Sequence, residues 1–154
     1  MKHYTSDTFD LVHCRQVLHH ARNLRQLCRE LARVLKPNGL MIATREHVVT
    51  SRRDLEPFLK RHVLHRLYGG ENAYPLEEYV AAITEAGIRL AKALNHYESD
   101  INLFPESITS TKARIARRFL LPWPTLIPDG LLSWRGRHMN TPGRLYTFVG
   151  RKNI

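Results

Sequence analysis

A helix that ends abruptly and leads directly into an apolar strand is the feature that most constrains the fold of this chain. From Asn23, a candidate N-cap, apolar residues recur at spacings of three and four up to Leu35, with arginines on the opposite side. Pro37 ends the helix, and Asn38–Gly39 tolerates the left-handed backbone of a tight turn. Residues 40–43 (LMIA) follow without polar alternation, which indicates a strand buried on both faces.

A second strand candidate, residues 9–13 (FDLVH), precedes the helix. Strand, helix and strand together span about 35 residues, which is the size of a parallel crossover unit. The turn is sharp because the helix must fold back onto the sheet. We therefore expect residues 9–13 and 40–44 to be adjacent parallel strands.

The remaining pattern predicts further helices and strands in one incomplete domain over residues 1–154. The predicted elements are a helix from about Asp54 to Leu67, a helix that begins at Pro75 and is capped by Gly87, a strand at Ile88–Tyr97 and a last strand at Leu145–Val149. Residues 98–144 form an insertion between the last two strands, rich in proline, arginine and aromatic residues. Within it, Thr111–Leu121 is typical of a basic amphipathic helix.

Composition narrows the class of protein. A chain of 154 residues with 43% hydrophobic residues can bury one core, and two cysteines are too few for a disulfide framework. We find no signal peptide and no apolar stretch long enough to span a bilayer, so we expect a soluble, cytoplasmic protein. The net charge of +10 favours anionic partners, although only residues 112–118 form a basic cluster.

Five segments in this order resemble the class I S-adenosylmethionine-dependent methyltransferases, in the branch often labelled type 11. The segments are Phe9–Val12 (FDLV), Val17–His20 (VLHH), Glu30–Gly39 (ELARVLKPNG), Tyr74–Tyr79 (YPLEEY) with Glu85–Ile88 (EAGI), and Phe148–Lys152 (FVGRK). The family usually has Pro-Gly-Gly where this chain has Pro37-Asn38-Gly39, and Asn also accepts a left-handed conformation. The resemblance implies an α/β fold: part of a doubly wound, Rossmann-like sheet whose last strand is antiparallel.

By this resemblance, the predicted strands correspond to the fourth to seventh of the family. The first three normally bring the glycine-rich turn and the acidic residue that hold S-adenosylmethionine, and no G-x-G-x-x-G occurs here. We therefore expect the carboxyl-terminal part of a truncated enzyme, inactive or nearly so alone. Residues 9–13 should form an exposed edge that self-associates or binds a complementary amino-terminal half.

The resemblance also implies candidate site residues. Residues just past the family's fourth strand line the methionine end of the cofactor, which here means Cys14, Arg15 and Gln16. His19 and His20 follow one turn later, and a neutral imidazole is a suitable acceptor for the proton of a methyl acceptor. The alternative is that one histidine caps the next helix and the other is solvated. Cys14 as a core residue is favoured over Cys14 as a nucleophile.

Two other features have competing interpretations. His62 and His65 could place two imidazoles on one helical face, but nothing nearby has metal-ligand spacing, so a surface pair is favoured and no metal is expected. For the insertion at 98–144, a packed cover over the sheet edge ranks first and a substrate lid second. An acidic membrane surface ranks third and nucleic acid last.

The leading hypothesis is methyl transfer from S-adenosylmethionine to an unidentified small-molecule acceptor. The alternative is a non-catalytic module or remnant that binds a partner half, a membrane surface or nucleic acid.

Overall fold

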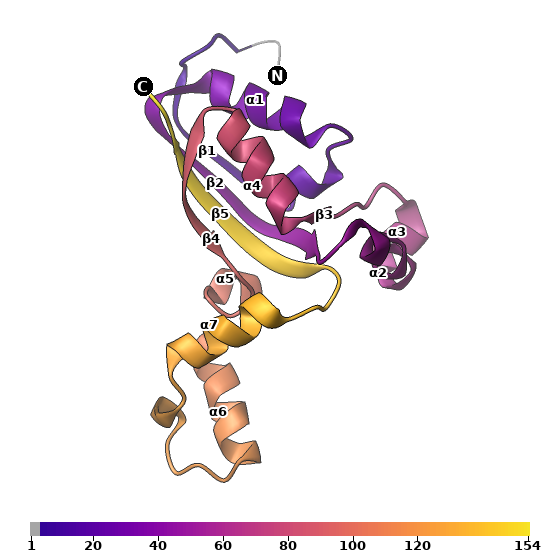
Figure 1. Ribbon diagram of the computed structural model, residues 1–154, viewed down its shortest axis with the longest axis vertical. Coiled ribbons are helices and arrows are strands. Elements are labelled where there is room, and N and C mark those ends of the chain that lie inside the picture. The colour runs from indigo at the N-terminus through magenta and orange to yellow at the C-terminus, as the bar shows by residue number, and fades with distance from the viewer. Residues whose placement is uncertain (1–3) are drawn as a thin grey trace.

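The computed structural model describes residues 4–154, and its centre is a twisted mixed sheet (Figure 1). The strands are β1 (Phe9–Arg15), β2 (Leu35–Val49), β3 (Tyr74–Pro75), β4 (Ile88–Leu94) and β5 (Arg144–Lys152). Their order is β1-β2-β5-β4, and the short β3 pairs with β2. β1 and β2 are parallel, whereas β5 is antiparallel to both of its neighbours. The antiparallel last strand and the mixed sheet were both expected.

The parallel pairing predicted for residues 9–13 and 40–44 is confirmed. Leu11 pairs with Leu40, and the ladder continues to Arg15 and Thr44. The helix α1 (Leu24–Val34) begins after Asn23, whose Oδ1 accepts a hydrogen bond from the Gln26 N–H at 3.0 Å. β2 begins at Leu35, earlier than predicted, because Leu35 already pairs with Phe9 across the turn. Asn38 has the predicted left-handed backbone, with φ of 61°.

The turn has no space for a side chain at residue 39, so it requires Gly39. A Cβ there would lie 2.8 Å from the carbonyl oxygen of Lys36 and 3.2 Å from that of Phe9. Both are backbone atoms, so the clash can be relieved only by moving the turn or β1. We expect Gly39→Ala to lower the free energy of unfolding by about 1–3 kcal/mol, measured by urea denaturation. Gly130→Ala is the control, because a Cβ there has no neighbour within 4 Å; equal losses in the two variants would contradict the argument.

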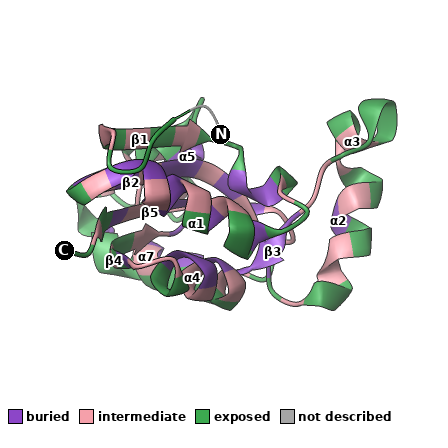
Figure 2. Cartoon of the chain, turned by 90° about the horizontal axis from the view of Figure 1, so that it is seen from above, coloured by how far each residue is buried: buried purple, intermediate pink, exposed green. Residues whose placement is uncertain are grey.

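Two helices, α1 and α4 (Leu76–Glu85), cover one face of the sheet (Figures 1 and 2). The residues of the main core come from both helices and from the strands. They include Leu31, Cys28, Ala82, Ile83, Tyr79, Met41, Ala43, Tyr146 and Phe148. Pro75 precedes α4 and Gly87 has φ of 84°, as the start and stop signals predicted.

The opposite face carries fewer buried side chains. Along β2, Met41 and Ala43 point into the core, whereas Leu40 and Ile42 alternate to the other face and are only partly buried. Leu11 on β1 is 50% exposed. Within residues 4–154, β1 also forms one edge of the sheet. A doubly wound sheet carries helices on both faces, so this face and edge resemble the inside of a larger sheet.

The single helix predicted over residues 54–67 is wrong, because the chain forms two shorter ones. α2 (Leu55–Arg61) and α3 (Val63–Tyr68) are separated by His62, whose backbone is extended. The His62 side chain accepts a hydrogen bond from the His65 N–H and so caps α3. Both helices lie beside the sheet and are largely exposed (Figure 2).

The insertion forms α5 (Asp100–Leu103), α6 (Ile108–Arg118) and α7 (Asp129–His138). α5 contacts β2 and β5, whereas α6 and α7 extend beyond the end of the sheet (Figure 1). α6 and α7 share a small apolar cluster of Ala116, Ile127 and Leu132. The predicted basic helix is present, starting and ending three residues earlier than expected. Among the described residues, no helix has the length and hydrophobicity needed to cross a bilayer.

Candidate functional site

The candidate site lies where β1 and β2 end, at the carboxyl edge of their parallel pair. Gln16 follows β1 and donates its N–H to the Thr44 carbonyl at 2.9 Å. Gln16 and Arg45 have φ of 54° and 59°, a left-handed conformation that is unfavourable for long side chains. Such strain is often concentrated at functional sites.

An irregularity in β2 determines where Glu46 points. Ala43 pairs with Phe148 and Glu46 with Tyr146, so β2 contains one more residue than β5 between these two pairs. This bulge interrupts the alternation of the strand, so that the consecutive residues Ala43 and Thr44 are both buried and Glu46 follows on the same side as Thr44. The Glu46 carboxylate therefore enters the protein interior instead of facing solvent.

Glu46 holds the segment that follows β1. Its Oε1 accepts the Val17 N–H at 3.0 Å, and its Oε2 accepts the His19 N–H at 3.1 Å and the His19 Nδ1–H at 2.7 Å. Burial alone would raise the pKa of this carboxyl. The hydrogen bonds from the His19 side chain and the two backbone N–H groups outweigh burial and hold the pKa of Glu46 below its usual range. Glu46 is thus a buried carboxylate that orients His19.

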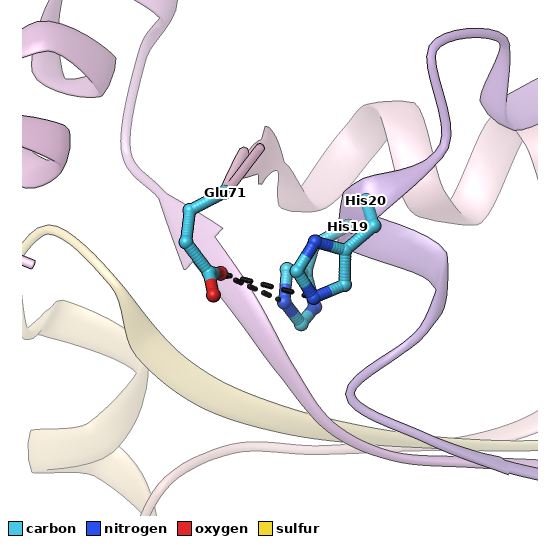
Figure 3. A group of neighbouring side chains, drawn as sticks. All are labelled: His19, His20 and Glu71. Atoms are coloured by element: carbon cyan, nitrogen blue, oxygen red, sulfur yellow. Dashed lines mark ion pairs between the residues drawn. The ribbon is translucent and has the colours of Figure 1, made fainter. Parts of the chain in front are cut away.

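His19 and His20 form a short 3-10 helix and converge on Glu71, which lies between α3 and β3 (Figure 3). The Glu71 Oε2 lies 3.5 Å from His19 Nε2 and 3.8 Å from His20 Nε2. The His19 side chain is 1% exposed, the Glu71 side chain 9% and the His20 side chain 44%. One histidine is therefore fully enclosed, and the other is reachable from solvent.

Two further histidines extend this cluster. The His47 ring lies 4.8 Å from the His19 ring and 5.1 Å from the His62 ring, measured between centroids. Burial lowers the pKa of His47 to about 4, so its imidazole is neutral at physiological pH. His62 contacts Phe58 and His47 and is partly buried. The expectation that His62 and His65 form a plain surface pair is therefore wrong for His62.

The residues expected to line the cofactor lie along the same edge. Cys14 is partly buried against the core, and burial together with the nearby Glu46 charge raises the pKa of its thiol to about 12. Cys14 is thus a protonated core residue near neutral pH. Arg15 and Gln16 are exposed, and Arg15 lines a surface hollow with Asp100, Ile101 and Phe104 of the insertion. The helix after His20 is capped by Asn23 and not by a histidine.

Sequence reasoning missed Glu46, His47 and Glu71. The strand predicted from the sequence ended at residue 44, before Glu46, and the bulge that buries Glu46 cannot be read from the pattern. Glu71 lies in the loop between α3 and β3, where no site residue was predicted. The adjacent pair Glu46-His47 at the end of an apolar strand was the available signal, because charged residues there lie at the edge where such sheets bind ligands.

Comparison with known families and structures agrees with this architecture. Residues 1–43 match the family model described as a methyltransferase domain. These residues include β1, the histidine pair, α1 and the turn at Asn38. No curated protein matches the chain.

Several solved structures share the fold. The putative methyltransferase in complex with the Trm112 activator from Haloferax volcanii is 18% identical, with a TM-score of 0.56 over 98% of this chain and 57% of that one. A putative sarcosine dimethylglycine methyltransferase from Galdieria sulphuraria is 20% identical, with a TM-score of 0.54 over 97% and 55% of the two chains. Phosphoethanolamine N-methyltransferase 2 from Haemonchus contortus, bound to phosphomonomethylethanolamine and S-adenosylhomocysteine, is 20% identical, with a TM-score of 0.55 over 98% and 35%.

The chain thus spans little more than half the length of the first two of these proteins. Residues 1–43 therefore match a methyltransferase family model, and nearly the whole chain shares part of the fold of the solved methyltransferases.

Proposed function

We propose that this chain supplies the acceptor side of an enzyme that transfers a methyl group from S-adenosylmethionine to a small molecule. The observation that carries the proposal is the strained carboxyl edge of β1 and β2, where Gln16 and Arg45 are left-handed. In doubly wound sheets, ligands bind beyond this edge. Arg15 and Gln16 are exposed there and would contact the methionine end of the donor, with Cys14 packed behind them.

The two histidines differ in their suitability as a proton acceptor. His19 Nδ1 is held by the buried Glu46 carboxylate, and the ring is 1% exposed. His20 is 44% exposed, so an acceptor can approach it without displacing the core. We assign proton removal to His20 and the positioning of this segment to His19. Methyl transfer needs alignment of the nucleophile with the sulfonium methyl in addition to any base.

The acceptor would lie between this edge and the insertion. Arg15 shares a surface hollow with Asp100, Ile101 and Phe104, which belong to α5 and the residue after it. A cation and an anion at the rim of an apolar surface suit a small amphipathic acceptor. The Haemonchus contortus enzyme, which holds a small phosphorylated amine, provides an analogy for acceptor size.

The donor half of the site requires residues outside this chain. The sequence contains no glycine-rich turn of the dinucleotide type, and the sheet face opposite α1 and α4 is only partly covered. We therefore expect isothermal titration of the chain alone with S-adenosylhomocysteine to give no binding heat. A mixture with the polypeptide encoded immediately upstream should bind it, and Arg15→Ala should weaken that binding.

Two outcomes would contradict the proposal. Micromolar binding of S-adenosylhomocysteine by the chain alone would mean that the donor site is complete within these residues. Absence of binding in the mixture, with both parts folded by circular dichroism, would reject methyl transfer as the function.

The exposed edge of β1 leads to a prediction about association. An apolar, unpaired strand edge favours pairing with another chain, so the isolated chain should form concentration-dependent oligomers in analytical ultracentrifugation. Leu11→Lys should shift the population to the monomer, because it places a charge on β1 where the side chain is 50% exposed. Leu131→Lys is the matched control, with Leu131 53% exposed on α7. A parent chain that stays monomeric at high concentration would contradict this prediction.

A second candidate function, binding to an anionic membrane surface, rests on the insertion. The large apolar side chains exposed there include Phe119 (70%), Leu120 (91%), Trp123 (66%) and Trp134 (56%). Arginines of α6 and α7 lie along the same surface as Phe119 and Trp134. Basic residues beside exposed aromatics suit an interfacial segment. Salt-sensitive co-sedimentation with phosphatidylserine vesicles, but not with phosphatidylcholine vesicles, would support this function.

A further inference from the structure

We propose that His19, His20 and Glu71 form a binding site for a first-row divalent transition metal such as Zn²⁺. Two imidazoles and one carboxylate are a ligand set that such ions accept, with remaining positions open to water or substrate. One ligand atom from each residue lies within 4.8 Å of the other two. The proposal concerns the chain as it stands and does not depend on the donor half of the methyltransferase site. An ion bound at His20 Nε2 takes the lone pair that proton removal by His20 uses, so the two roles belong to different states of the chain.

The distances between the Glu71 carboxylate and the two imidazoles match the spacing of ligand atoms around a metal ion better than the length of a hydrogen bond. Glu71 Oε2 lies 3.5 Å from His19 Nε2 and 3.8 Å from His20 Nε2. Both separations are too long for a hydrogen bond between a carboxylate and an imidazole. Ligand atoms about 2.1 Å from a tetrahedral zinc ion are about 3.4 Å apart. A small contraction of the cluster would therefore complete the coordination.

The hydrogen bonds at the other ring nitrogen orient both histidines for this role. His19 Nδ1 lies 2.7 Å from the Glu46 carboxylate, and His20 Nδ1 lies 3.1 Å from the Gly70 carbonyl. Both partners are acceptors, so each Nδ1 carries the proton and each neutral ring turns the lone pair of Nε2 toward Glu71. A carboxylate or carbonyl behind a histidine is the usual outer partner of a metal ligand.

The Glu71 Oε2 atom accepts no hydrogen bond within the described part of the chain. This atom is buried, and the Glu71 side chain is only 9% exposed (Figure 3). A buried carboxylate oxygen is ordinarily paired, and an unsatisfied one calls for an explanation such as an ion. A cation between the three side chains would supply the missing interaction.

A second group of His47, His62 and Glu71 also lies within 4.8 Å. In this group His62 Nδ1 accepts the His65 N–H, so the neutral ring carries its proton on Nε2. His47 Nδ1 faces the Gly143 carbonyl at 2.9 Å, which leaves His47 Nε2 unprotonated. We therefore assign the ion to the group of His19 and His20, which is also reachable from solvent through His20.

The test is calorimetric titration of the full chain with ZnCl₂, free of chelators, in a weakly coordinating buffer. We expect one equivalent to bind. Glu71→Gln and His20→Gln should each weaken binding at least tenfold. His138→Gln is the control, because His138 is an exposed histidine of α7 far along the chain from this cluster. Variants are compared only if they retain the far-ultraviolet spectrum of the parent.

A second measurement on the parent chain needs no variant. Diethyl pyrocarbonate should modify His20 without zinc and leave it unmodified with zinc, whereas His138 should react in both cases; mass spectrometry of peptides reads the result. Equal zinc affinity in the parent, Glu71→Gln and His20→Gln would overturn the site. Loss of binding in His62→Gln but not in His20→Gln would overturn the assignment to this group.

Discussion

Replacing Glu46 with alanine is expected to lower the free energy of unfolding by about 3–5 kcal/mol. Glu46 is fully buried and accepts three hydrogen bonds, from the Val17 N–H, the His19 N–H and the His19 imidazole. The alanine variant leaves the two His19 donors buried without an acceptor, and water cannot replace the carboxylate there without opening the core. Urea denaturation followed by circular dichroism measures the change.

The control is Glu30→Ala. Glu30 pairs with Arg33 at 3.1 Å on the surface of α1, where its side chain is 39% exposed. Surface ion pairs contribute less than about 1 kcal/mol. If the two variants lost equal stability, Glu46 would not have the structural role that its hydrogen bonds indicate.

The contribution of Glu46 should also depend on pH in a defined direction. Its pKa in the folded protein is lowered from the ordinary value of 4.5. A carboxyl with a depressed folded pKa stabilises the protein above its unfolded pKa, and this stability is lost as pH falls through the folded pKa. The difference between the parent and Glu46→Ala should therefore be constant near neutral pH and shrink in acid. A difference that grows in acid would contradict this assignment.

Phe148→Ala is expected to lower the free energy of unfolding by about 3–5 kcal/mol, because it leaves a large cavity at the centre of the core. Phe148 is 0% exposed, and its ring lies 5.1 Å from that of Tyr79 and 6.2 Å from that of Tyr146, measured between centroids. It therefore joins β5 to α4.

Phe119→Ala removes the same atoms from a side chain that is 70% exposed on the insertion. A surface substitution of this kind changes stability by less than about 0.5 kcal/mol. Differential scanning calorimetry should show a large drop in melting temperature for Phe148→Ala alone. A comparable drop for Phe119→Ala would mean that the insertion packs more tightly than its exposure indicates.

The local sequence pattern was sufficient to predict the strand–helix–strand unit of residues 9–44. The apolar spacing after Asn23, the stop at Pro37 and the left-handed Asn38 act over a few residues, so they determine α1 and the turn into β2 whatever surrounds them. The parallel pairing of β1 with β2 followed, because a helix of this length returns the chain beside its first strand. Three of the five segments that carry the family resemblance lie in this unit.

The break between α2 and α3 at His62 was not visible in the sequence, because an imidazole caps α3 in place of a more usual capping residue. The bulge before Glu46 was also hidden, since it arises from how β5 pairs with β2 and not from either strand alone. The bulge thus depends on residues far apart in the sequence, whereas the cap at His62 is local.

The sequence by itself therefore determined which segments are helix or strand within residues 9–44 and which family the chain resembles. The meeting of His19 and His20 with Glu71, some 50 residues later, was decided only by the tertiary structure. The physical reason is that burial of Glu46 by the bulge aims His19, while the loop before β3 must pass the end of β2 to begin α4. Side-chain clusters of this kind are products of packing, which no local pattern encodes.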